Sequence, residues 1–224
     1  MAGLFDTLFG RRRAGDGPLA AALAHYPPNL PAHVGPAKRL TPAMAAENLQ
    51  RFLATRDERL AALAAVLADH DVDVSPILEP TADPAPAFAR LTAWLAEALP
   101  PRAWMPGGAA VNAPIDAFVA SERRGDDILF SLVADLALLE GEGITRRRDE
   151  WRWELDQLPE DAGSYPYRRV VVWRDRQGER PAIALDLEHE VLEVVYALRG
   201  RAPTAAPPLG RTLSGIVAGG FDHI

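Results

Sequence analysis

Apolar residues recur at steps of three and four through most of the first two thirds of the chain, and this spacing marks one face of an α-helix. The longest such stretch covers residues 41–69 and begins with Thr41 and Pro42, a capping hydroxyl followed by proline at the first helical position. The same spacing predicts three further helices, over residues 83–100, 114–123 and 126–146.

After residue 148 the pattern changes from the helical period to strict alternation, which is typical of half-buried strands. We expect strands over residues 151–155, 167–173 and 182–185. Asp186 then has the features of a helix N-cap, and a last helix is expected to run from there to Gly200. The predicted fold is therefore of the α+β class: an N-terminal helical region, a three-stranded antiparallel meander and a C-terminal covering helix.

Proline and glycine divide the chain into three parts. Residues 1–40 are expected to form an N-terminal arm and a Pro-rich linker, and residues 201–224 a Pro/Gly-rich tail. Residues 41–200 are expected to form a single α+β domain, helical over 41–146 and a meander plus helix over 150–200. The tail is either mobile or a docked segment, since it carries an apolar set: Leu209, Leu213, Ile216, Val217 and Phe221.

The first thirteen residues combine apolar side chains at helical spacing with a basic cluster. These residues are Leu4, Phe5, Leu8, Phe9, Arg11, Arg12 and Arg13. The order of apolar and basic residues does not fit a secretory signal, and no apolar run is long enough to span a bilayer. Two interpretations stay open: a helix that contacts a membrane surface or a partner, or a terminus that packs on its own domain.

Composition and missing motifs exclude several classes of protein. The chain has 224 residues, no cysteine and a formal net charge of -7, so disulfides, thiolate metal sites and cysteine nucleophiles are ruled out. The HEVLE sequence at 189–193 lacks the second histidine of a zinc helix, and no metal or cofactor is expected. Residues 146–180 carry nine arginines against eight acidic residues, which is too balanced for phosphate binding, so no nucleic acid is expected.

Glu140 is the strongest candidate for a functional residue. It projects into or beside the apolar stripe of the helix over 126–146, and it is the one carboxylate that we expect to be substantially buried. One interpretation pairs it with Arg147, Arg152 or Arg169 as a structural clamp. The other makes Glu140 a general base in a cleft beside Trp104 and Trp151, with His189 as a second catalytic candidate.

Two residues are candidates for binding a partner or a ligand. Trp104 lies in a Gly-Pro loop and is expected to be an exposed anchor. Arg152 lies on a strand whose alternation gathers it with other arginines on one surface. Trp151 and Trp153 alternate on the same strand and are expected to be core residues first and a ligand platform second.

The segment over residues 138–153, LLEGEGITRRRDEWRW, resembles uncharacterised bacterial domains in which a helix ending in Gly-Glu leads through a basic turn into a strand with tryptophan. The resemblance extends over residues 126–200. It implies a small α+β domain of unknown function.

Absent catalytic signatures and termini suited to docking favour a non-enzymatic, cytoplasmic bacterial protein that acts through protein–protein contacts, as an adaptor, a chaperone-like factor or an immunity-type binder. A homodimer is left open. One alternative is a small hydrolase or ligand-binding domain that uses Glu140. The other is a peripheral membrane protein held by the N-terminal LFDTLFGRRR segment.

Overall fold

The computed structural model describes residues 18–100, 105–106, 114–199 and 208–220. The α-helices in these ranges are α2 (Pro18–Ala22), α3 (Pro42–Ala68), α4 (Ser75–Leu78), α5 (Ala85–Ala98), α6 (Pro114–Ala120), α7 (Leu129–Thr145), α8 (Leu187–Ala197) and α9 (Arg211–Val217). Short 3-10 turns lie at Ala37–Arg39, Gly125–Asp127 and Pro159–Asp161. The strands are β1 (Trp151–Leu155), β2 (Val170–Arg174) and β3 (Ile183–Leu185).

The three strands form one antiparallel sheet in the order β1-β2-β3, with Trp153 opposite Val172 and Val172 opposite Leu185. This arrangement confirms the predicted α+β fold. Strand β2 begins at Val170 and not at residue 167, because Arg168 has a left-handed φ of 64° and its backbone N–H donates to the Asp156 carbonyl in the preceding loop.

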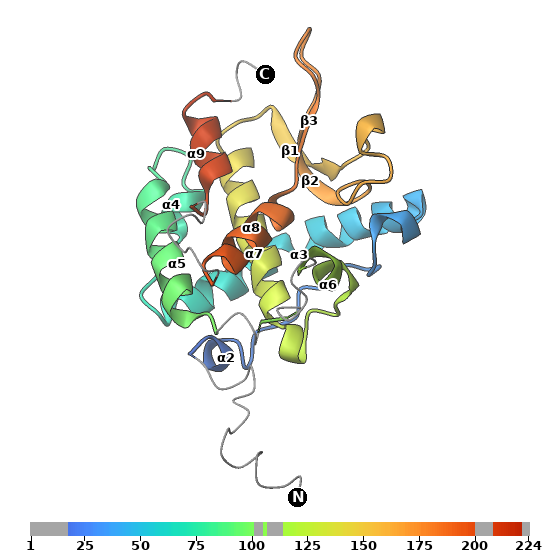
Figure 1. Ribbon diagram of the computed structural model, residues 1–224. Helices are drawn as coiled ribbons and strands as arrows, with labels where there is room; N and C mark the ends of the chain where they lie inside the picture. The colour runs from blue at the N-terminus through green and yellow to red at the C-terminus, as the bar shows by residue number, and fades with distance from the viewer. Residues whose placement is uncertain (1–17, 101–104, 107–113, 200–207, 221–224) are drawn as a thin grey trace, which may run out of the picture.

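Helix α7 is the centre of the molecule. Figure 1 shows it between α4 and α5 on one side and the sheet on the other, with α8 packed alongside. The amphipathic pattern predicts one buried face, but every residue from Leu129 to Ile144 is buried. A helix that is enclosed on all sides must satisfy or neutralise each polar side chain it carries, and α7 carries four of them: Ser131, Asp135, Glu140 and Glu142.

Both predicted helix starts with a side-chain cap are confirmed. The Thr41 hydroxyl accepts a hydrogen bond from the Met44 backbone at the start of α3, and the Asp186 carboxylate accepts one from His189 at the start of α8. The structure also adds helices that the pattern did not predict, chiefly α2, α4 and α9. These are four to seven residues long, which is too short for a periodic signal.

The hydrophobic core extends beyond residues 41–200. Leu19, Leu23 and Tyr26 join it from the N-terminal side, and Leu209, Leu213 and Ile216 join it from the C-terminal side. The docked alternative is therefore confirmed for Leu209, Leu213 and Ile216, whereas Val217 is exposed and Phe221 lies outside the described residues. None of the described helices combines the length and apolar character that crossing a bilayer requires.

Helix α7 approaches the sheet most closely at Gly141. A Cβ atom built there would lie 2.2 Å from Cη2 of Trp153 and 2.9 Å from Cγ2 of Val172. The missing side chain therefore lets the Trp153 indole lie directly on the helix, where its Nε1 donates to Glu142 at 2.9 Å.

We expect the substitution Gly141→Ala to lower the free energy of unfolding by about 1–3 kcal/mol, because the indole and β2 must move to admit the methyl group. Urea denaturation measures the change. Helix propensity alone favours alanine over glycine by about 1 kcal/mol, so a variant more stable than the wild type would contradict the close packing described here.

Candidate functional site

A buried cluster on α7 fixes the N-terminal segment to the core. The Asp135 carboxylate is fully buried and accepts hydrogen bonds from Tyr26 Oη at 2.5 Å, Asn29 Nδ2 at 2.7 Å and Arg59 Nε at 3.0 Å. A second Arg59 nitrogen, Nη2, binds the other carboxylate oxygen, and Arg59 Nη1 donates to the Pro27 carbonyl at 2.8 Å. Burial and the neighbouring Asp135 raise the pKa of Tyr26, so the phenol stays protonated and acts as a donor.

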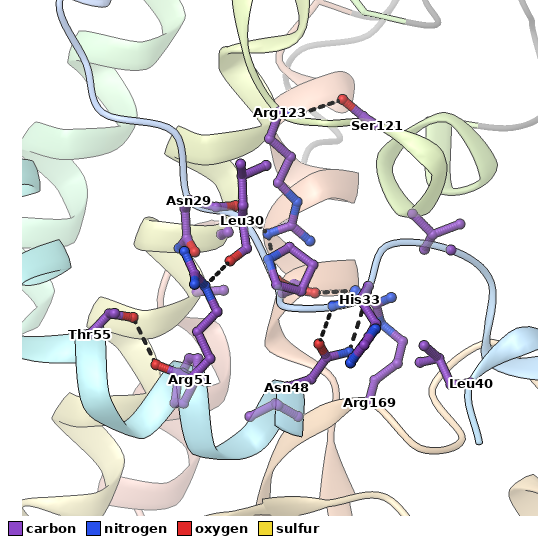
Figure 2. Close-up of a pocket in the computed structure, with 18 of the residues that line it drawn as sticks. Asn29, Leu30, His33, Leu40, Asn48, Arg51, Thr55, Ser121, Arg123 and Arg169 are labelled. Carbon is purple, nitrogen blue, oxygen red and sulfur yellow. Dashed lines mark hydrogen bonds and ion pairs between the residues drawn. The ribbon is translucent and has the colours of Figure 1, made fainter. Parts of the chain in front are cut away.

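This cluster positions one wall of a pocket. Residues 29–40 lead away from the cluster to the 3-10 turn at Ala37–Arg39, and they face α3, the end of α6, α7, strands β1 and β2 and the start of α8 (Figure 2). Between them lies a cavity of about 70 Å³ that opens to solvent. The segment is also held along its length, since the backbone N–H of His33 donates to Asn48 Oδ1 at 2.7 Å and the Leu40 carbonyl accepts from Arg168 Nη1 at 2.7 Å.

Three arginines from three different parts of the chain line this cavity: Arg51 from α3, Arg123 after α6, and Arg169 just before β2. Glu188, from the first turn of α8, is the one acidic residue in the lining. We refer to this cavity as the arginine pocket. Its lining carries an excess of positive charge in a chain whose formal net charge is -7.

Glu188 bridges two of the arginines. Its Oε1 lies 3.2 Å from Arg123 Nη1, and its Oε2 binds Arg169 Nη2. Burial favours the neutral acid, but Arg123 and Arg169 outweigh it and lower the pKa of Glu188 below its usual value. All three groups are therefore charged, and the trio keeps one excess positive charge.

The arginines retain unused donors. Among the residues that the structure describes, Arg51 uses only its Nε, which donates to the Leu30 carbonyl at 2.8 Å, so both of its Nη groups are without a protein partner. The Nε of Arg169 is buried and has no hydrogen-bond partner in the same ranges. The Arg51 Nη groups are open to solvent at the edge of the cavity, and the unpaired Arg169 donor is costly because it is buried, so this pocket has the capacity to bind an acceptor.

Two more unsatisfied groups lie behind Arg169. Its guanidinium lies 4.8 Å from the centre of the Tyr165 ring, and within the described part of the chain Tyr165 Oη and Asp186 Oδ2 are buried without partners. Burial raises the pKa of Asp186 to about 6, although Arg169 opposes this shift. Perturbed titratable groups that gather beside a cavity are typical of functional sites.

Glu140 is buried as predicted, with 1% of its surface exposed, but the predicted arginine partners are wrong. Its Oε1 accepts a hydrogen bond from the Leu213 backbone at 3.1 Å, at the start of α9. Burial and the nearby Glu190 carboxylate raise the pKa of Glu140 to about 8. Glu140 is not among the residues that line the arginine pocket.

The three arginines proposed for Glu140 have other partners. Arg147 donates to the carbonyls of α4 and the turn after it, including Ile77 at 2.6 Å, and Arg169 pairs with Glu188. Arg152 pairs with Asp175 across the exposed face of the sheet, at 2.6 Å, and does not line the pocket. The helical projection correctly predicts that Glu140 is buried. It gives no information on α9, whose backbone and not an arginine donates to the Glu140 carboxylate.

The expectation of a single buried carboxylate is also wrong. Asp135, Glu142 and Asp156 are buried as well, with exposed fractions of 0%, 4% and 0%. Asp135 and Glu142 lie on faces of α7 that the apolar stripe leaves polar, and the structure covers those faces with α3, the N-terminal segment and Trp153.

Of the other predicted site residues, His189 is exposed on α8, 3.5 Å from Glu193, which is the surface pair expected of an i, i+4 spacing. Trp151 is buried in the core as expected, while Trp153 is partly buried and lines the pocket. Trp104 and residues 4–13 lie outside the described residues. Within the described ranges, no three acidic or histidine side chains are placed to hold a metal ion.

No protein-family model, curated protein or solved structure matches this chain.

Proposed function

We propose that this protein is a ligand-binding module that takes a small anion in the arginine pocket. The observation that carries the proposal is the lining of the cavity, which holds three arginines and a single acidic residue, and in which Arg51 and Arg169 keep donors that no described residue uses. Arginine forks suit carboxylate and phosphate groups, and a partly buried site strengthens such charge-assisted hydrogen bonds.

The rigid surroundings support the same function. The wall formed by residues 29–33 is held by the Asp135 cluster at one end and by Asn48 at the other. A pocket that is formed before the ligand arrives loses little conformational entropy on binding. Burial of Glu140 beneath α9 does not support hydrolysis by that residue, because a general base must reach its substrate.

The expectation of a cytoplasmic bacterial protein that acts through contacts with other proteins stays a prediction. It is compatible with a binding module, because a bound anion would neutralise charge at the surface around Arg51 and so change what that surface contacts.

Isothermal titration with inorganic phosphate and with acetate, at constant ionic strength, tests the proposal. We expect saturable binding of at least one anion and an approximately tenfold weaker affinity in Arg51→Gln, because one charge-assisted hydrogen bond is lost. Arg51 is exposed, so the variant is expected to fold normally.

The matched control is Arg152→Gln, which removes an arginine of similar exposure that lies outside the pocket. Its affinity should equal that of the wild type. No saturable binding of either anion, or equal losses in the two variants, would contradict the proposal.

A further inference from the structure

The arginine pocket has an apolar floor as well as charged walls. We propose that its ligand is a short amphipathic carboxylate, whose carboxylate group binds the arginines of the pocket, with Arg51 donating through its Nη groups, and whose apolar tail lies on this floor. The inference rests on the proposed function and adds the chemical class of the ligand.

The apolar part of the lining, which we call the floor, is formed by aliphatic and aromatic side chains. It consists of Leu30, Phe52, Val119, Ala134, Ala137 and Trp153. Ala134 and Ala137 lie one turn apart on α7, next to the buried leucines of that helix, and their small side chains leave space that a leucine would fill. A cavity that is lined by both apolar side chains and arginines fits a ligand that has an apolar part and an anionic part.

An aromatic pair closes one side of the floor. The rings of Phe52 and Trp153 meet edge to face, with their centres 4.6 Å apart. Trp153 is fixed from behind by its hydrogen bond to Glu142 and by contact with Gly141. The Phe52–Trp153 pair is therefore already in place before a ligand binds. An apolar tail can pack against it without the loss of side-chain entropy that ordering the two rings would cost.

The charge around the pocket favours a monoanion. Arg51, Arg123 and Arg169 carry three positive charges, Glu188 in the lining carries one negative charge, and Asp186 beside Arg169 carries a second one above about pH 6, so one net positive charge is left. A phosphate dianion would meet the Glu188 carboxylate with its second charge, whereas a carboxylate matches the single excess charge and the planar guanidinium fork.

The size of the cavity limits the tail. At about 10–15 Å³ for each water-sized group, a cavity of about 70 Å³ holds about five to seven such groups. A carboxylate group takes about half of this space, so the buried part of the tail should hold about three carbons. Each methylene group that is buried strengthens binding about fourfold, up to the length at which the tail reaches solvent.

Titration calorimetry with acetate, propionate and butyrate, alongside inorganic phosphate, butylamine and 1-butanol, tests the inference. We expect affinity to rise about fourfold per carbon along the carboxylates and butyrate to bind more tightly than phosphate. Butylamine and 1-butanol, which share the tail but lack the anion, should not bind measurably.

The substitution Ala137→Leu separates this inference from the proposed function. It fills the floor and leaves the arginines in place, so acetate should still bind while the gain from propionate and butyrate disappears. Because overpacking can destabilise α7, Ala134→Val is the milder second variant and should reduce the gain in part.

Anion binding that is sensitive to Arg51→Gln but independent of tail length would overturn the amphipathic ligand and leave the binding module standing. A gain with tail length that persists in both alanine variants would also overturn it, because the tail would then lie elsewhere. If no anion binds at all, both proposals fail.

Discussion

Replacing Asp135 with alanine is expected to lower the free energy of unfolding by about 3–5 kcal/mol, because it leaves Arg59 buried without its counter-charge. The same change removes the acceptor of Tyr26 and Asn29, so the N-terminal segment loses its attachment to α7. Chemical denaturation followed by circular dichroism measures the loss.

The matched control is Asp175→Ala, which breaks the exposed pair with Arg152 on the sheet. Exposed ion pairs contribute little, so this variant should unfold at nearly the wild-type urea concentration. A loss below about 1 kcal/mol in the Asp135 variant would show that the cluster does not hold the N-terminal segment in solution.

The second large effect is a pH dependence that depends on Glu140. Its pKa is raised from 4.5 to about 8 in the folded protein, so the folded state binds a proton that the unfolded state releases. The contribution of Glu140 to stability is therefore complete below about pH 4.5, declines as the pH rises and is lost once the pH has passed about 8.

The substitution Glu140→Gln removes the titrating group and keeps an acceptor for the Leu213 backbone. We expect the stability of the variant relative to the wild type to increase by about 2–4 kcal/mol between pH 5 and pH 9, with most of the change below pH 8. Other buried acids such as Asp156, with a pKa raised to about 6 by burial, titrate in both proteins and cancel in the difference.

Urea denaturation at each pH gives this difference, and Glu193→Gln, an exposed position on α8, serves as its control. A difference that does not vary with pH would mean that Glu140 is ionised throughout, and its environment would then have to contain a cation that the described residues do not supply. Opening of α9 above pH 8 should accompany the change, because α9 helps to bury Glu140 and burial is what disfavours the ionised carboxylate.

Much of the fold follows from the sequence because its signals are local. Thr41 and Asp186 cap the helices that they were expected to cap, and the alternation from Trp151 gives β1 with its predicted bounds. The helical spacing of the apolar residues is also sufficient to predict that Glu140 is buried.

The partners of the buried charges do not follow from the sequence. Asp135 accepts hydrogen bonds from Tyr26 and Arg59, which lie 109 and 76 residues away in the sequence. No local sequence pattern predicts contacts over such separations. In the same way, Glu140 is satisfied by the backbone of α9, a group that every residue type supplies. Backbone donors leave no compositional signal at all.

The arginine pocket is hidden from sequence analysis for a related reason. Arg51, Arg123 and Arg169 belong to separate elements, and each lies among many other arginines. The wall that completes the site comes from residues 29–40, a proline-rich stretch that gives no periodic signal. Only the packing of α3, α7 and α8 brings these parts together.

The most direct measurement of anion binding in the arginine pocket is a nuclear magnetic resonance titration of the arginine Nε–Hε signals with butyrate. We expect the signals of Arg51, Arg123 and Arg169 to shift and saturate together, with the signal of Arg152 unchanged, because only the first three line the cavity. Assignment uses the single Arg→Gln variants. Signals that stay in place, or that shift without saturation across exposed arginines including Arg152, would contradict anion binding in the arginine pocket.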